Sequence, residues 1–268
     1  MVVIAFVLGL AVGAVVNVLA DVLPPDELGL RRPLRPPYCA YCGAEYAPRL
    51  WLALGHWVLR RGSCEHCGAT RRLRHVVVEL ILGICLAGTW VWAGGRWTVF
   101  LPAAVLSFIF ALISVIDIEH RLVLWRVVLP AAVVIGLMQA LNQGGLKTVL
   151  GGLAGYGLVM GMFLLGQLFS LGLALLRGHP LEEVAFGGGD VNLAALVGLT
   201  VGWPGILVAL VVTIFSAGAF AMSYLLVQAV RRRYNPYTPI PYGPFFVLGA
   251  AVVYLFGHQF AGWYIAQH

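Results

Sequence analysis

Long apolar runs constrain this chain more than any other feature of its sequence. Of the 268 residues, 61% are hydrophobic and only 10% are charged, which leaves too little polar surface to cover a water-soluble fold. A helix of about 20 apolar residues crosses a hydrocarbon core of roughly 30 Å, and a helix satisfies its backbone hydrogen bonds internally. The sequence therefore predicts an all-α polytopic membrane protein with about eight transmembrane helices. The eight apolar runs are 2–20, 76–93, 98–116, 124–141, 148–175, 190–202, 204–229 and 244–265.

The sixth run is the shortest, and it is either a full span or a buried, partly re-entrant segment. The distribution of basic residues favours a full span, because eight crossings place 15 of the 17 Lys and Arg residues on one side. The positive-inside rule then predicts that this side is cytoplasmic and that both termini lie outside. No basic residue precedes the first run, which argues against a cleaved signal peptide. The net charge of +6 is thus explained by topology, so we expect membrane lipids and no nucleic acid among the partners.

One polar segment, residues 21–75, is long enough to form a small domain. It contains two Cys-x-x-Cys pairs separated by 21 residues, and each pair is followed by a glycine that suits a tight turn. Four thiolates at this spacing predict a tetrahedral zinc site, and the predicted cytoplasmic location favours metal binding over disulfides. His66 is expected to be a loop residue, and Cys85 a small buried hydrophobic residue in an apolar run. The four predicted zinc ligands are Cys39, Cys42, Cys64 and Cys67.

Two acidic residues stand at the edges of apolar runs. Asp117 closes the third run, and Asp190 opens the sixth directly after three glycines. A charged group near hydrocarbon is costly, so each acid is a candidate functional residue. Taken alone, each acid is explained equally well as the end of its span. Eight spans place both acids at the cytoplasmic membrane edge, where two close carboxyl groups would share a proton and act as a general acid and base. Glycines before Asp190 would let an extended substrate backbone approach. Asp21 is expected to be solvated with the rest of the polar segment.

Several motifs in order along the chain resemble the type IV prepilin peptidases, a family also called leader peptidases. The resemblance includes the GGGD at 187–190 with its GxGD form, the VIDIEHRL around Asp117, the double Cys-x-x-Cys loop, and IPYGPF at 240–245. GAVVNV at 13–18 and VVVELILG at 76–83 extend it over almost the whole chain.

The resemblance implies an intramembrane aspartyl protease of the inner membrane, which cuts the basic leader from type IV prepilins or pseudopilins at the cytoplasmic face. Many members also methylate the new N-terminus with S-adenosylmethionine. The implied domains are a first transmembrane helix at 1–20, a cytoplasmic zinc-binding domain at 21–75 and a protease helix bundle at 76–268.

The implied site residues are those that match the family motifs. Asp117 and Asp190 correspond to the catalytic aspartates, Gly187 and Gly189 to the glycines of GxGD, and the four cysteines to the zinc ligands. Glu119, Glu182 and Glu183 are further candidates, from charge alone, to attract the basic leader. A role for Tyr242 and Gly243 is suggested only by the resemblance.

The chain departs from the family pattern at three places. Residues 123–125 read Val-Leu-Trp where the family has Ile-Pro-Asp or Ile-Pro-Asn, and Asn192 stands where a lysine is common. Residues 20–24 read Ala-Asp-Val-Leu-Pro in place of an arginine-containing element. These changes bear on substrate preference and on methyl transfer.

Two other classes of protein remain open from the sequence. A proton-coupled transporter would use the membrane-edge acids as a relay, but it would need polar residues deeper in the spans, where Asn17, Gln167 and Gln228 are the few present. A membrane thiol oxidoreductase would use the cysteine pairs as redox couples. Bound zinc would distinguish the metal site from this second alternative.

Overall fold

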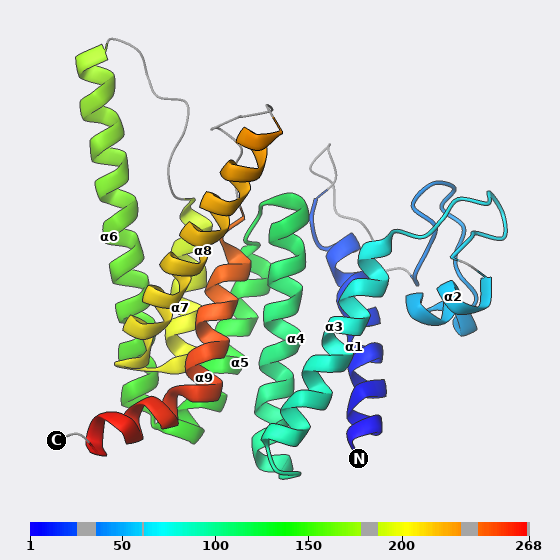
Figure 1. Cartoon of the computed structure of the whole chain (residues 1–268), viewed down its shortest axis with the longest axis horizontal. Coiled ribbons are helices and arrows are strands. Elements are labelled where there is room, and N and C mark those ends of the chain that lie inside the picture. Colours follow the sequence, from blue (N-terminus) through cyan, green and yellow to red (C-terminus); the bar gives the residue numbers. More distant parts are fainter. Residues whose placement is uncertain (26–35, 61, 178–186, 232–240, 267–268) are drawn as a thin grey trace. The chain divides into compact units, whose positions relative to one another are not determined.

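A computed structural model describes residues 1–25, 36–60, 62–177, 187–231 and 241–266. Within these residues the fold is all-helical, which confirms the predicted class (Figure 1). Each of the eight predicted runs corresponds to one helix, and two short helices lie in the polar segment. The helices are α1 (Val2–Val22), η1 (Pro48–Leu50), α2 (Ala53–Arg60), α3 (Leu73–Trp92), α4 (Trp97–His120), α5 (Trp125–Gln143), α6 (Gly145–Arg177), α7 (Gly188–Val201), α8 (Gly205–Val230) and α9 (Gly243–Ala266).

Six of the described helices are long and apolar enough to cross a membrane, namely α1, α3, α4, α5, α6 and α8. The helix α7 and the Gly243–Gly257 part of α9 are apolar but shorter. The multi-pass membrane fold is thus established, while the count of eight crossings stays a prediction. The chain divides into two compact units, Met1–Ile116 and Asp117–His268. The predicted domain boundaries at residues 20 and 75 also stay a prediction.

In the first unit, α1 and α3 pack side by side through glycines. A Cβ added at Gly13 would stand 2.6 Å from the Glu79 Cα, and one added at Gly83 would stand 2.9 Å from the Phe6 ring. Small residues at such positions let helix backbones approach closely within a membrane. Cys85 is exposed on α3, so its predicted burial was wrong. Its apolar run is long enough to be a span, and one face of a span can remain uncovered by other helices.

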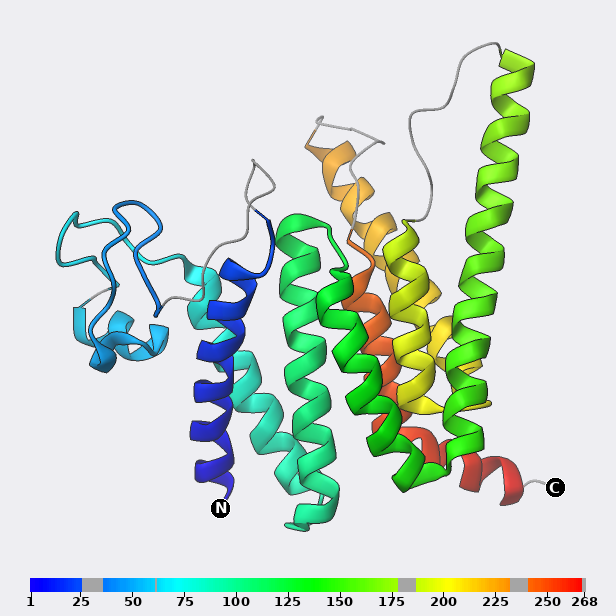
Figure 2. The same ribbon diagram turned by 180° about the vertical axis from the view of Figure 1, so that it is seen from behind.

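In the second unit, α7 is the central helix and packs against α5, α6, α8 and α9. A helix that is apolar on all sides is expected to be buried, which accounts for the short α7. Gly151 and Gly155 of α6 lie directly against the backbone of Gly198 and Ala194 of α7. The glycine-rich stretch 151–157 therefore serves helix packing. The starts of α5, α7 and α9 and the ends of α6 and α8 lie at the same end of this unit (Figures 1 and 2).

Candidate active site and metal centre

Asp117 lies in the last turn of α4 and is buried, with 5% of its surface exposed. Its Oδ2 accepts a hydrogen bond of 2.7 Å from the backbone N–H of Gly243, the first residue of α9. A Cβ at Gly243 would stand 2.6 Å from this Oδ2 and 3.0 Å from the Asp117 Cγ. Atoms of a real side chain do not approach so closely, so the contact requires glycine. Gly243 is therefore a positioning residue for Asp117, a role that only the IPYGPF resemblance hinted at.

Asp190 lies in the first turn of α7 and is half-buried. Its Oδ2 accepts a hydrogen bond of 3.2 Å from the Gly187 N–H, and its own N–H donates to Gly187 O at 3.1 Å. The two bonds form a reciprocal cap that fixes the carboxyl group at the start of the helix. A Cβ at Gly189 would stand 2.8 Å from the Val123 Cβ, while nothing lies within 4 Å of such an atom at Gly188. Gly189 is thus required by packing, and Gly188 is not.

The two carboxyl groups are brought together in the second unit. They are near enough for the charge of Asp117 to act on Asp190. Asp117 accepts a hydrogen bond from the first residue of α9, and Asp190 lies in the first turn of α7. These two helices begin at the same end of the unit (Figure 1). Two interacting carboxyl groups in a half-buried setting can serve as a general acid and a general base.

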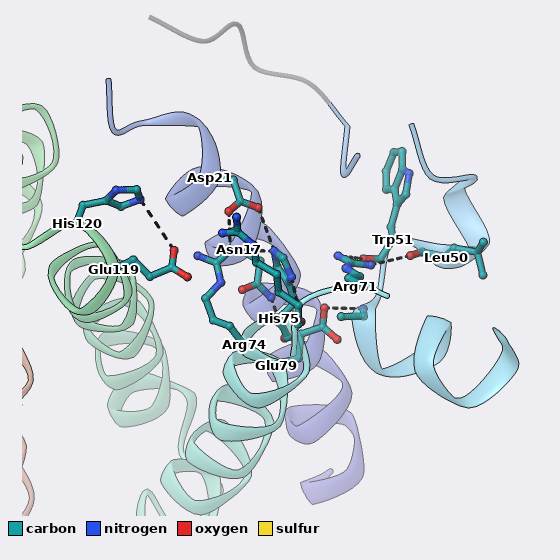
Figure 3. A network of polar contacts seen from close by, with 12 residues as sticks. Asn17, Asp21, Leu50, Trp51, Arg71, Arg74, His75, Glu79, Glu119 and His120 are labelled. Carbon is teal, nitrogen blue, oxygen red and sulfur yellow. Dashed lines mark hydrogen bonds and ion pairs between the residues drawn. The ribbon is translucent and has the colours of Figure 1, made fainter. Parts of the chain in front are cut away.

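The other polar candidates contribute less to this geometry. Asn192 makes one long hydrogen bond of 3.5 Å from its Nδ2 to Gly188 O. Glu119 contacts His120 on the same helix end at 4.0 Å (Figure 3). Glu182 and Glu183 lie outside the described residues.

The four predicted zinc ligands come together in the polar segment. Their Sγ atoms all lie within 4.8 Å of one another, and the pairs Cys39–Cys67 and Cys42–Cys64 are each 3.7 Å apart. Four sulfurs about 2.3 Å from a tetrahedral zinc ion would be separated by about 3.8 Å, so the observed distances fit zinc. All four cysteines are free, and their distances exceed the roughly 2.05 Å of a disulfide bond.

Both cysteine pairs adopt the same backbone turn. In the first turn, the Cys39 N–H donates to Ala44 O at 2.8 Å, and the Gly43 N–H donates to Cys39 O at 2.9 Å. The equivalent bond in the second turn runs from the Gly68 N–H to Cys64 O at 3.0 Å. Gly43 and Gly68 have φ angles of +73° and +71°, which explains the glycine after each pair.

The environment of Cys39 favours a metal-binding thiolate. Burial opposes its ionisation, but backbone N–H groups of Cys42 and Tyr41 donate to the sulfur, and the pKa of Cys39 is lowered to about 6. A thiolate near neutral pH is the form that binds metal.

Two buried charges connect the cysteine turns to the transmembrane helices. Glu79 of α3 is fully buried, and its Oε1 and Oε2 accept the N–H groups of Ala53 and Leu54 at 2.8 and 2.9 Å (Figure 3). These N–H groups begin α2, where a carboxylate is favoured by the unpaired donors and the helix dipole. Arg71 donates to Leu50 O at 3.0 Å, and its charge acts on Glu79. No role for Glu79 was predicted from the sequence, because its partners lie 25 and 26 residues away.

Asp21 is also part of a polar network, so its expected solvation was wrong. It lies in the last turn of α1, and its Oδ1 accepts a 2.6 Å hydrogen bond from Arg74 Nη2 (Figure 3). Its Oδ2 lies 3.0 Å from His75 Nε2. The helix α1 continues past the predicted end of its apolar run, which brings Asp21 beside the start of α3.

Two family profiles match the chain. The profile of the type IV leader peptidase family matches residues 103–222, and that of the bacterial peptidase A24 N-terminal domain matches residues 7–93. Together they cover most of the chain, including Asp117, Asp190 and the four cysteines.

The chain is also similar along nearly its whole length to proteins named prepilin leader peptidase/N-methyltransferase. It is 29% identical to the protein from Stutzerimonas stutzeri, over 97% of this chain and 92% of that protein. It is 28% identical to the Pseudomonas aeruginosa protein, over 96% and 91%, and 22% identical to the Aeromonas hydrophila protein, over 98% and 93%. No solved structure matches the chain significantly.

Proposed function

Because the chain belongs to the type IV leader peptidase family, we propose that it is an intramembrane aspartyl endopeptidase that removes the basic leader from type IV prepilins or pseudopilins. The observation that carries this proposal is the pair of acids at one end of the second unit. Asp117 and Asp190 lie 73 positions apart in the sequence, yet the charge of one acts on the other.

In the proposed reaction, one carboxylate takes a proton from water while the water oxygen bonds to the scissile carbonyl carbon. The other carboxyl group, protonated, donates to the carbonyl oxygen. The tetrahedral intermediate then collapses, the C–N bond breaks, and the leaving nitrogen takes a proton. The hydrogen bond from Gly243 fixes the orientation of Asp117. The exposed Gly187 and Gly188 leave room for an extended substrate backbone, whereas Gly189 packs against Val123.

The proposed site lies at the cytoplasmic edge of the inner membrane. The positive-inside rule supports this orientation, because it places the basic polar segment on the same side as both acids. The apolar segment of a prepilin would then lie among the spans and lipids, with its basic leader in the cytoplasm. Glu119 is the described acid nearest in sequence to Asp117 and is our candidate to attract that leader.

The four cysteines are proposed to hold a structural zinc ion. Four thiolates complete a tetrahedral shell and leave no open position for catalysis, so the ion would stabilise the polar segment. This segment has a core cluster of only four described residues, which is too small to fold it without help. The cluster consists of Cys39, Tyr46, Leu50 and Cys64.

A second activity, methylation of the new N-terminus, is proposed from the names of the relatives. S-adenosylmethionine would supply the methyl group to the α-nitrogen of the cleaved pilin, and this nitrogen loses a proton. The sulfonium of S-adenosylmethionine becomes a thioether in the same step.

Mass spectrometry of a prepilin co-expressed with this protein tests the proposal. We expect two separate mass changes in the pilin, the loss of the leader and the gain of one methyl group. A prepilin of unchanged mass, with the protein present in the membrane, would contradict the peptidase assignment.

A further inference from the structure

The short helix α2 exposes an apolar face, although it belongs to the polar segment. Ala53 and His56 are fully buried, and the His56 ring packs edge-on against Tyr46 at 4.9 Å. The remaining side of the helix carries the residues named here the outer face, which are Trp57, Val58 and Leu59. They are 40%, 77% and 67% exposed. A helix in water normally presents polar side chains on its exposed side, so this face suits a different medium.

Glu79 fixes the level of α2 along the span α3. The N–H groups of Ala53 and Leu54, which begin α2, donate to its carboxyl group at 2.8 and 2.9 Å. Glu79 stands six positions after Leu73, where α3 begins, and this is about 9 Å along a helix. Figures 1 and 2 show α2 beside α3, with the cysteine turns nearer the level at which α3 begins. Helices that lie in a membrane interface insert to a similar depth of roughly 5–10 Å.

The medium at this level of α3 is lipid. Val77 and Ile81 stand two positions before and after Glu79 in an apolar span, and they are 43% and 54% exposed. The first N–H groups of a helix have no partner within it, and little water is present at this depth to supply one. The buried Glu79 carboxyl supplies that acceptor to α2. The start of α2 is therefore built for a position inside the membrane boundary.

We propose that α2 is an interfacial helix whose outer face lies in the headgroup–acyl boundary of the bilayer that the spans cross. It would hold the cysteine segment against the membrane. Trp57 has the amphipathic ring that is common at this level. Arg49 and Arg60 flank α2 in the sequence, and basic residues near a membrane favour anionic headgroups.

Photocrosslinking of the full-length protein tests the lipid contact, in nanodiscs of phosphatidylethanolamine and phosphatidylglycerol. We expect Val58→p-benzoylphenylalanine to form phospholipid adducts on illumination, detected by mass spectrometry of the labelled peptide. The same substitution at Ile84, which is 64% exposed on α3, is the positive reference. The matched control is Tyr41, which is 72% exposed on the first cysteine turn and should form no phospholipid adduct.

Adducts at positions 58 and 84 but not at 41 support the proposal. Adducts at position 84 alone overturn it, and so do equal lipid adducts at 41 and 58. A crosslink from position 58 to a protein, whether a second copy or another chain, also overturns it, because the outer face would then be a protein interface.

A charge on the outer face gives an independent measurement. If Val58 lies in lipid, Val58→Glu should lift α2 from the bilayer and speed trypsin cleavage within residues 36–60 by roughly tenfold, as loss of one buried valine side chain implies. Tyr41→Glu adds the same charge at a similarly exposed position and should leave that rate unchanged. Equal rates for Val58→Glu and the wild-type protein, with zinc retained in both, would show that α2 faces water. Neither measurement uses a prepilin, so the result is independent of the proposed peptidase activity.

Discussion

Replacing Gly243 with alanine tests how the structure holds Asp117. The added Cβ would stand 2.6 Å from Asp117 Oδ2 and 3.0 Å from its Cγ, so either α9 or the carboxyl group must move. The movement breaks the 2.7 Å hydrogen bond from the Gly243 N–H. A hydrogen bond to a charged group contributes about 1.5–3 kcal/mol. If this bond orients Asp117 in the transition state, its loss corresponds to a roughly 10- to 100-fold lower kcat/KM.

The assay is the initial rate of prepilin cleavage by purified protein in liposomes, with substrate well below KM. Gly257→Ala is the matched control, because it lies in the same helix and, among the described residues, its added Cβ meets only Val253 at 3.6 Å. The reasoning is refuted if Gly243→Ala cleaves at the wild-type rate, or if Gly257→Ala loses as much activity.

Three further predictions follow from the packing and the metal site. Gly189→Ala should lower the rate of prepilin cleavage, because its Cβ would stand 2.8 Å from the Val123 Cβ. Gly188→Ala should leave the rate unchanged, because nothing lies within 4 Å of its Cβ. Equal rates for the two variants would contradict the packing argument. Zinc transfer to a chelator should speed up as the pH falls, because protons compete with zinc for the thiolates, and a rate independent of pH would argue against thiolate ligation. Glu79→Gln should weaken the hydrogen bonds at the start of α2 by about 1–3 kcal/mol. We expect trypsin to cut faster within residues 36–60 of this variant and at an unchanged rate elsewhere in the chain.

Local patterns were enough to predict the helices and the clustering of the four cysteines. A span is a continuous apolar run, and a four-thiolate site is two short motifs with a glycine after each, so both can be read within a window of sequence. The cysteine prediction was accurate because Gly43 and Gly68 adopt the turns that their spacing indicated. The distribution of Lys and Arg residues over eight crossings predicted that Asp117 and Asp190 lie at the same membrane edge.

The contacts that orient these sites could not be predicted in the same way. Gly243 is 126 positions from Asp117, and its donor is a backbone N–H that no side-chain pattern reveals. Glu79 sits in an apolar run, and its role depends on where α2 begins. Asp21 appeared to belong to a solvated segment because the sequence does not show that α1 extends far enough to place it beside Arg74. All three contacts depend on packing between segments that lie far apart in the sequence.

The most direct test of the central claim is cleavage of a prepilin by Asp117→Asn and Asp190→Asn, with Glu45→Gln, a change at an exposed acid of the polar segment, as the control. All variants should reach the membrane in equal amounts and retain zinc. We predict that each aspartate variant leaves the prepilin uncleaved and that the glutamate variant cleaves it. Full cleavage by either aspartate variant would contradict a reaction that requires both acids.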